Sequence, residues 1–150
     1  MNFKKLESGR SMVEMLGVLA IIGVLSVGGI AGYSLSMRRH RANGVADMVS
    51  KYALVTYNQC QQKVMNGELN GIDGCYYSNM MSFEDAGIGA FPSGVSDMFI
   101  LGMQTDAQTG IDKVTVGVGF NDEKLCQAAG SISGLGCSGG SSVNFEIKQN

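Results

Sequence analysis

A stretch of 23 residues without a charged side chain, from Met15 to Met37, constrains this chain more than any other feature. As an α-helix it would be about 34 Å long, which is enough to cross the hydrocarbon core of a bilayer. A soluble domain of this size has little surface with which to cover such a helix on all sides. A membrane anchor that the protein retains is therefore the favoured interpretation.

Two other interpretations of this stretch remain open. It can be the core helix of a soluble domain, or a secretory signal peptide that begins with the charges of Lys4 and Lys5 and is cut near Ala31, in the small-residue stretch 29–32. For a retained anchor, the positive-inside rule gives no orientation, because basic residues flank both ends. These residues are Lys4, Lys5 and Arg10 before the stretch and Arg38, Arg39 and Arg41 after it.

All four cysteines follow the uncharged stretch, and none of them has the CxxC spacing of zinc or thioredoxin-like sites. They are Cys60, Cys75, Cys126 and Cys137. An even number of widely spaced cysteines beyond a membrane segment predicts disulfides in an oxidising compartment. The C-terminal part of the chain is therefore expected outside the membrane; free buried cysteines in a cytosolic domain are the alternative.

Composition predicts one domain with a modest core, because the chain has 150 residues of which 45% are apolar. The formal net charge is −2, and no basic stripe interleaved with aromatic residues is present. Both observations argue against nucleic acid as a general partner.

One carboxylate, Glu14, stands immediately before the uncharged stretch. A carboxylate costs about 2.5 to 3.5 kcal/mol at full membrane depth on insertion scales, and less near the interface, so we expect it to have a partner. Arg10, four residues earlier on the same helix face, is one candidate partner. An ion pair at this spacing stabilises a helix by about a few tenths of a kcal/mol.

The run "SGRSMVEML", preceded by the short basic leader "MNFKKLESG", resembles the class III leader and N-terminal helix of type IV pilins and of their relatives, the pseudopilins. The resemblance covers residues 1–60 and is weaker beyond. It implies that a prepilin peptidase cuts between Gly9 and Arg10 and methylates the new amine. It also implies that Glu14 pairs with the N-terminal ammonium of a neighbouring subunit. The family usually has Phe or another apolar residue where this chain has Arg10.

The resemblance also implies a life cycle and a set of partners. The precursor lies in the inner membrane, and the cleaved subunit joins a homopolymeric filament at the cell surface with the help of a pilus assembly machinery. In such filaments the anchor helix often loosens near its middle, which places the loosening here at Gly23, Gly28 and Gly29. The GxxxG spacing of Gly28 and Gly32 supports close helix packing as the alternative.

The segment 38–62 contains no proline, and its apolar residues recur at spacings of three and four, which predicts an amphipathic continuation of the helix. They are Val45, Met48, Val49, Tyr52, Val55 and Thr56. "NGELNGIDG", residues 66–74, has dense turn chemistry that ends any helix, and "DAGIGAFPSG", residues 85–94, is a second irregular stretch.

Three strands and a short helix are expected in the remainder. The strands are residues 97–104, 112–120 and 142–148, and the helix is residues 122–130, stopped by glycine. The order predicts an α+β fold, a long helix packed on a small antiparallel sheet, in agreement with the pilin fold that the resemblance implies. The expected parts are a leader (1–9), a membrane and filament-core helix (10–37), its amphipathic continuation (38–62) and a globular head (63–150).

Four cysteines permit three disulfide connectivities. Cys60 is expected near the end of the long helix, and the turn-rich stretch after it can fold Cys75 back onto it. Cys126, on the short helix, needs only the Gly/Ser-rich loop to meet Cys137. We therefore predict the pairs Cys60–Cys75 and Cys126–Cys137; the second resembles the disulfide-bounded C-terminal region of type IVb-like pilins.

No catalytic, cofactor or metal constellation stands out. His40, the only histidine, lies among arginines just past the uncharged stretch, where a solvated or headgroup role is favoured over general-base chemistry. "GVGF", residues 117–120, is better explained by glycines that allow close packing than by a phosphate loop. "TDAQTGID", residues 105–112, lacks the alternating carboxylates and final glutamate of a calcium loop, so we expect a plain turn.

Two classes of function remain at this point. The first is a non-enzymatic structural subunit of a type IV pilus-like filament, a group in which major pilins, minor pilins and the pseudopilins of type II secretion share the same N-terminal chemistry. The second is a monomeric, membrane-anchored binding module. The four cysteines favour a pilus, whose fibres must survive outside the cell.

Overall fold

A computed structural model of the chain describes residues 10–149, with side chains from residue 12 onward. Internal contacts divide the chain into two units, which meet between Met37 and Arg38.

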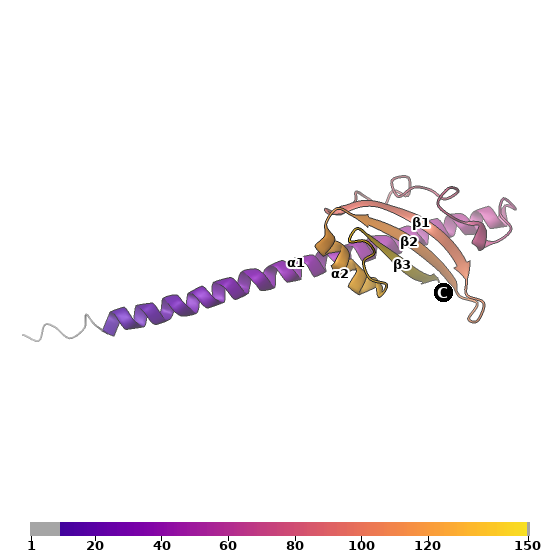
Figure 1. Cartoon of the computed structure of the whole chain (residues 1–150). Helices are drawn as coiled ribbons and strands as arrows, with labels where there is room; N and C mark the ends of the chain where they lie inside the picture. Colours follow the sequence, from indigo (N-terminus) through magenta and orange to yellow (C-terminus); the bar gives the residue numbers. More distant parts are fainter. Residues whose placement is uncertain (1–9, 150) are drawn as a thin grey trace, which may run out of the picture. The chain divides into compact units, whose positions relative to one another are not determined.

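Helix α1 runs from Arg10 to Met65 and contributes residues to both units (Figure 1). It ends three residues later than the predicted boundary at residue 62, immediately before the expected turn stretch that begins at Asn66. Gly67 has a φ of 78°, its N–H donates to the Val64 carbonyl, and the Glu68 N–H donates to the Lys63 carbonyl. This pair of bonds is a Schellman motif, which closes a helix on a left-handed glycine.

In the second unit, one face of α1 is buried against the sheet. The buried residues recur every three or four positions, as predicted, although Met48 and Val55 on the expected face are only half-buried. The fully buried set is Ala42, Val45, Val49, Tyr52, Ala53, Thr56 and Cys60. The Thr56 hydroxyl donates to the Tyr52 carbonyl at 2.7 Å, so this polar side chain is satisfied within the core.

The sheet has three antiparallel strands in the order β1-β2-β3: β1 is Val95–Thr105, β2 is Asp112–Phe120 and β3 is Ser142–Gln149. The strands lie over the C-terminal part of α1 (Figure 1). Alternate residues face the core, among them Ile100, Val116 and Phe145. The predicted α+β arrangement, a long helix packed on a small antiparallel sheet, is therefore confirmed.

The short helix α2, Glu123–Ser133, lies against β3 and differs from its prediction at the C-terminal end. Asp122 is its N-cap and accepts hydrogen bonds from the N–H groups of Lys124 and Leu125. The expected stop at Gly130 is wrong: the helix continues to Ser133 and ends on Gly134, whose φ is 74°. Gly130 is buried inside the helix. A Cβ there would lie 2.6 Å from the backbone nitrogen of Cys137, so the close approach of the loop requires glycine at this position.

The segment between α1 and β1 contains one turn of 3-10 helix, η1 (Ile72–Gly74), and is otherwise irregular, as expected for residues 85–94. Three aromatic rings fasten it to α1. Tyr52 meets Phe83 edge-on with ring centroids 5.5 Å apart, and Phe83 stacks on Phe91 at 4.6 Å. These ring contacts, with Tyr52 and Phe83 buried and Phe91 half-buried, give this long loop a fixed position on the head.

Candidate functional site

The apolar surface of α1 in the first unit has nothing within the described chain that covers it. The large apolar side chains between Met12 and Leu35 are each 51–75% exposed. Among the described residues, one helix is long and apolar enough to cross a membrane, a test that signal sequences also pass, and its most apolar window is entirely unburied. The soluble-core interpretation of this stretch thus receives no support, because such a helix would be covered.

Two serine hydroxyls on this surface donate to carbonyl groups of the helix itself. The Ser26 hydroxyl donates to the Ile22 carbonyl at 2.7 Å, and the Ser34 hydroxyl donates to the Ala31 carbonyl at 2.9 Å. Such back-bonding lets a hydroxyl enter an apolar environment without an orphaned hydrogen-bond group. These two hydroxyls can therefore enter lipid or pack against other helices at little polar cost.

The glycines of this segment leave open notches on the helix. An added Cβ at Gly23, Gly28, Gly29 or Gly32 would meet no atom within 4 Å. The helix is regular through these positions in the single chain. Loosening of Gly23 to Gly29 concerns an assembled fibre, so it stays a prediction.

Glu14 lies in the second turn of α1 with an exposed side chain, and no described side chain forms an ion pair with it. Gly9, on one side of the predicted cleavage point, lies outside the described residues. Arg10, on the other side, is the first residue of α1, and its side chain also lies outside the described part. The structure thus places Glu14 on α1 directly before the uncharged helix surface that extends from Met15 to Met37.

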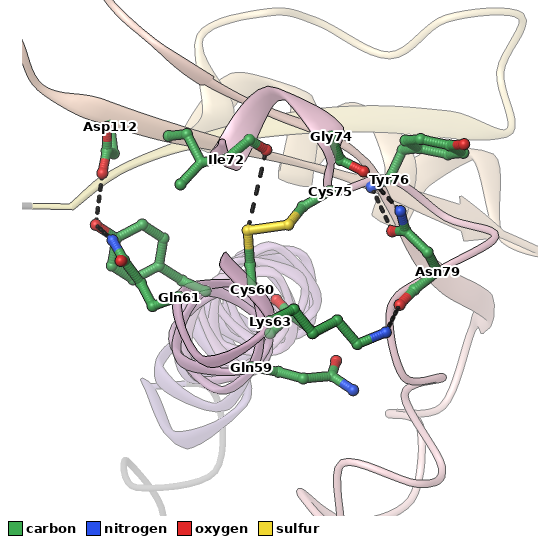
Figure 2. The surroundings of a disulfide bond; sticks show 12 residues. Gln59, Cys60, Gln61, Lys63, Ile72, Gly74, Cys75, Tyr76, Asn79 and Asp112 are labelled. Carbon is green, nitrogen blue, oxygen red and sulfur yellow. Dashed lines mark hydrogen bonds between the residues drawn. A yellow bond between two sulfur atoms is a disulfide. The ribbon is translucent and has the colours of Figure 1, made fainter. Parts of the chain in front are cut away.

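Cys60 and Cys75 form the first disulfide, with Cα atoms 6.0 Å apart, which is the predicted pairing (Figure 2). The bond ties the end of α1 to the segment after η1. This segment also bonds to β1, because the Met103 N–H donates to the Cys75 carbonyl. Lys63 adds a hydrogen bond from its ammonium to the Asn79 carbonyl. The disulfide therefore lies in a junction between helix, loop and sheet.

A polar network fixes the β1–β2 hairpin to the same helix end. The Tyr57 hydroxyl donates to one carboxylate oxygen of Asp112 at 2.5 Å, and Thr105 donates to the other at 2.8 Å. The Gln61 amide donates to the Tyr57 oxygen. The hydrogen bond to Asp112 raises the pKa of Tyr57 above its ordinary value, because the bond requires the protonated phenol.

Cys126 and Cys137 form the second disulfide, also with the predicted partners, and their Cα atoms are 5.6 Å apart. Cys126 is fully buried on α2. The loop that carries Cys137 lies directly over Gly130, where the Gly136 N–H donates to the Gly130 carbonyl. The disulfide and this close approach together hold the Gly/Ser-rich loop on the head.

The stretch 105–112 forms a plain turn, as predicted. Asp106 accepts hydrogen bonds from the N–H groups of Gln108 and Thr109 and pairs with Lys113 at 3.1 Å. The bond and charge of Lys113, followed by those backbone bonds, lower the pKa of Asp106 below its ordinary value. Throughout the part of the chain that the structure describes, no group of three or more His, Cys, Asp or Glu side chains could hold a metal ion.

The glycines of "GVGF" serve close packing, as expected. Gly117 faces Phe99 on the neighbouring strand, and a Cβ at Gly117 would lie 2.9 Å from that ring. At Gly119 a Cβ would collide with the carboxylate of Asp97. Two side chains of β1 thus lie flat over the central strand, on the sheet face opposite α1.

An open hollow of about 600 Å³ beside β1 was not foreseen from the sequence. It lies between Tyr52 on α1, the irregular loop and the outer strand, and its walls include Phe91, Tyr77 and Phe99. Tyr77 and Phe91 lie in the irregular loop, where no helical or strand periodicity indicates which side chains face the same way. Only a composition signal was available, namely three phenylalanines and three acidic residues between positions 83 and 99.

No protein-family model, no curated protein and no solved structure matches this chain.

Proposed function

We propose that this chain is a non-enzymatic structural subunit of a type IV pilus-like filament. It is inserted in the inner membrane as a precursor, cleaved after Gly9 and polymerised through the N-terminal part of α1. The single observation that carries the proposal is the uncovered, uncharged helix surface from Met15 to Met37 with the carboxylate of Glu14 at its head. Such an apolar surface requires contacts from outside the chain. In this proposal lipid supplies them while the precursor is in the membrane, and other copies of the helix supply them in the filament.

The head supports the same proposal. Two disulfides, between cysteines 15 and 11 residues apart in sequence, fasten its loops to the helices α1 and α2. Cross-links of this kind suit a domain that functions in an oxidising space outside the cell. The α+β arrangement is the one expected from the resemblance of residues 1–60 to pilins. The C-terminal disulfide loop favours a pilus subunit over a pseudopilin of type II secretion.

Glu14 has a defined role in this proposal. Cleavage after Gly9 creates an ammonium group on Arg10, and a neighbouring copy brings that group to Glu14 in the apolar fibre core. The pair replaces two isolated charges there, so removal of one partner leaves an uncompensated charge that costs several kcal/mol per subunit. Because every subunit in the fibre carries the same defect, the loss is collective.

The test compares three variants of the full chain in the cells that produce it. Glu14→Ala is expected to give cleaved, membrane-resident protein and few or no filaments in sheared surface material viewed by negative-stain microscopy. Gly9→Val is expected to leave the full-length precursor in the membrane. Glu7→Ala is the matched control, because Glu7 lies in the proposed leader and its loss leaves the mature subunit unchanged.

Mass spectrometry of the sheared material completes the test. The mature chain is expected to begin at Arg10. A chain that begins at Met1, or near Ala31, would contradict the processing step. Normal filament yield from Glu14→Ala would remove the proposed role of the carboxylate, and a monomeric surface protein without filaments would favour the membrane-anchored binding module instead.

A further inference from the structure

The hollow beside β1 combines aromatic walls with negative charge. Three carboxylates line it, those of Glu84, Asp85 and Asp97, and no Lys, Arg or His is among its described lining residues. All three acidic residues are exposed. In the described chain none of them takes part in an ion pair. Their negative charge is therefore uncompensated within the head.

Local hydrogen bonds hold two of these carboxylates in place. The Ser82 hydroxyl donates to Asp85 at 2.6 Å, and the Ser96 hydroxyl donates to Asp97 at 3.3 Å. Asp97 is held further by its position over Gly119 on the outward sheet face. The acceptors are thus preorganised, with lone pairs left for a ligand.

A second hollow, of about 340 Å³, adjoins the first. Both are lined by Tyr77, Asp97 and Phe99, and Leu101 extends the second along β1. Tyr77 and Phe99 meet edge-on, with ring centroids 5.8 Å apart. We call the two hollows together the acidic groove. Its length along β1 suits a short extended or helical segment better than a single small molecule.

Carboxylates next to aromatic rings select cations, and guanidinium groups above all. A guanidinium stacks on an aromatic face through its plane and donates two parallel hydrogen bonds to a carboxylate. An ammonium is a more strongly hydrated point charge and uses such a site less well. The chemistry of the acidic groove therefore calls for arginine side chains.

The chain itself carries a segment of matching charge. Residues 42–150 contain five Lys, no Arg and eleven Asp or Glu, a net charge of −6, whereas three arginines lie within residues 38–41. Arg39 and Arg41 are exposed on α1. This separation of charge makes the arginine segment of one copy attractive to the acidic head of another.

We propose that the acidic groove receives the arginine segment 38–41 of a second copy of this chain. The proposal rests on the proposed function in one respect: in a fibre built through residues 10–37, the arginine segment follows directly after the apolar core and so lies among the heads of neighbouring copies. There the exposed Arg39 and Arg41 exchange solvent for the carboxylates and rings of the groove. The groove thus sets which neighbouring copies bind each other and in what register.

A peptide-binding experiment tests the groove without fibres. A fluorescent peptide with the sequence of residues 36–43, SMRRHRAN, is titrated with the full chain in nonionic detergent micelles, and anisotropy reports binding. The triple variant Glu84→Gln, Asp85→Asn, Asp97→Asn is expected to bind about tenfold more weakly or worse, because three charge-assisted contacts are lost. The variant Glu146→Gln is the matched control, since Glu146 is an exposed carboxylate on β3 outside the groove.

Three results would overturn the proposal. They are absence of binding, equal binding by the triple variant, and equal binding of a peptide in which glutamine replaces the three arginines. Agmatine distinguishes the source of the guanidinium: an affinity equal to that of the peptide would assign the groove to free cations rather than to a second copy.

Fibre yield separates this proposal from the proposed function. In producing cells, Asp97→Arg is expected to lower the amount of sheared filament, and the added change Arg39→Asp is expected to restore part of it. If the unaltered chain forms no filaments while the peptide binds, the proposed function fails and the acidic groove stands. If filaments form and the charge variants change neither yield nor peptide binding, the acidic groove fails and the proposed function stands.

Discussion

The disulfide between Cys126 and Cys137 offers a quantitative test of how the head is stabilised. The perturbation is the double change Cys126→Ala, Cys137→Ala, which removes the bond without leaving a reactive thiol. In the loop-entropy description, a cross-link over 11 residues stabilises the folded state by about 2.8 kcal/mol. For a head of this size, a loss of that amount lowers the melting temperature by roughly 10–20 °C.

The contacts around the bond remain when the cross-link is removed. Gly136 still donates to the Gly130 carbonyl, and the loop still lies over Gly130 without a cross-link. These contacts belong to the folded state and leave the unfolded ensemble free, so they do not replace the entropic effect. The single variant Cys137→Ser is expected to lower the amount of surface filament through instability, while cleavage after Gly9 proceeds normally.

The assay is thermal unfolding of the full chain in detergent, followed by the circular dichroism of the sheet. The pair Cys60→Ala, Cys75→Ala is a second test of the same relation, because its 15-residue separation predicts a loss of about 3 kcal/mol. A fall of less than about 3 °C for the first pair would refute the entropic reasoning. Non-reducing peptide maps that show Cys60 linked to Cys126, or four free thiols in surface protein, would refute the pairing itself.

Three further predictions follow from particular residues. Gly130→Ala is expected to destabilise the head by about 1–3 kcal/mol in the same melts, because its Cβ would meet the backbone of Gly136 and Cys137, whereas Gly28→Ala, with open space around it, should leave the head unchanged. Burial raises the pKa of Tyr52 from 10.0 to about 12, so its stabilising contribution is complete below pH 10 and is lost as the pH rises towards 12; unfolding curves at pH 8 and pH 11 should differ less for Tyr52→Phe than for the unaltered chain. A filament map should show a stretched backbone between Gly23 and Gly29, and an unbroken α-helix there would favour close packing through the GxxxG spacing instead.

Local patterns in the sequence were enough for most of the fold. The strand β2 has the predicted bounds, because alternation of apolar residues over nine positions is a direct record of a half-buried strand. The end of α1 follows from the chemistry of Asn66 and Gly67, which needs no distant partner. The disulfide partners could also be predicted from the sequence, since each pair closes a short loop beside a helix.

The exposed apolar surface of α1 and the position of Glu14 before it were likewise determined by the sequence, because the absence of charge over Met15 to Met37 can be read from the residues alone. The C-terminal end of α2 could not be predicted from the local sequence. Glycine at position 130 has the local signature of a helix stop, yet it is there because a loop seven residues later approaches its Cα. Both a helix stop and a close approach of another segment require glycine, and only the tertiary structure shows which of the two applies at this position.

The acidic groove shows the same division most plainly. Its walls come from α1, from the irregular loop and from β1, and residues as far apart as Tyr52 and Phe99 line it together. No periodicity in the sequence links such residues, because a loop fixed by stacked rings has no repeat. The sequence by itself determined which segments are helix and strand, and where the uncharged part of the long helix lies, through short-range hydrogen bonding and apolar patterning. The tertiary structure alone decided where carboxylates and aromatic rings converge, since that depends on chain segments that meet only after the core has formed.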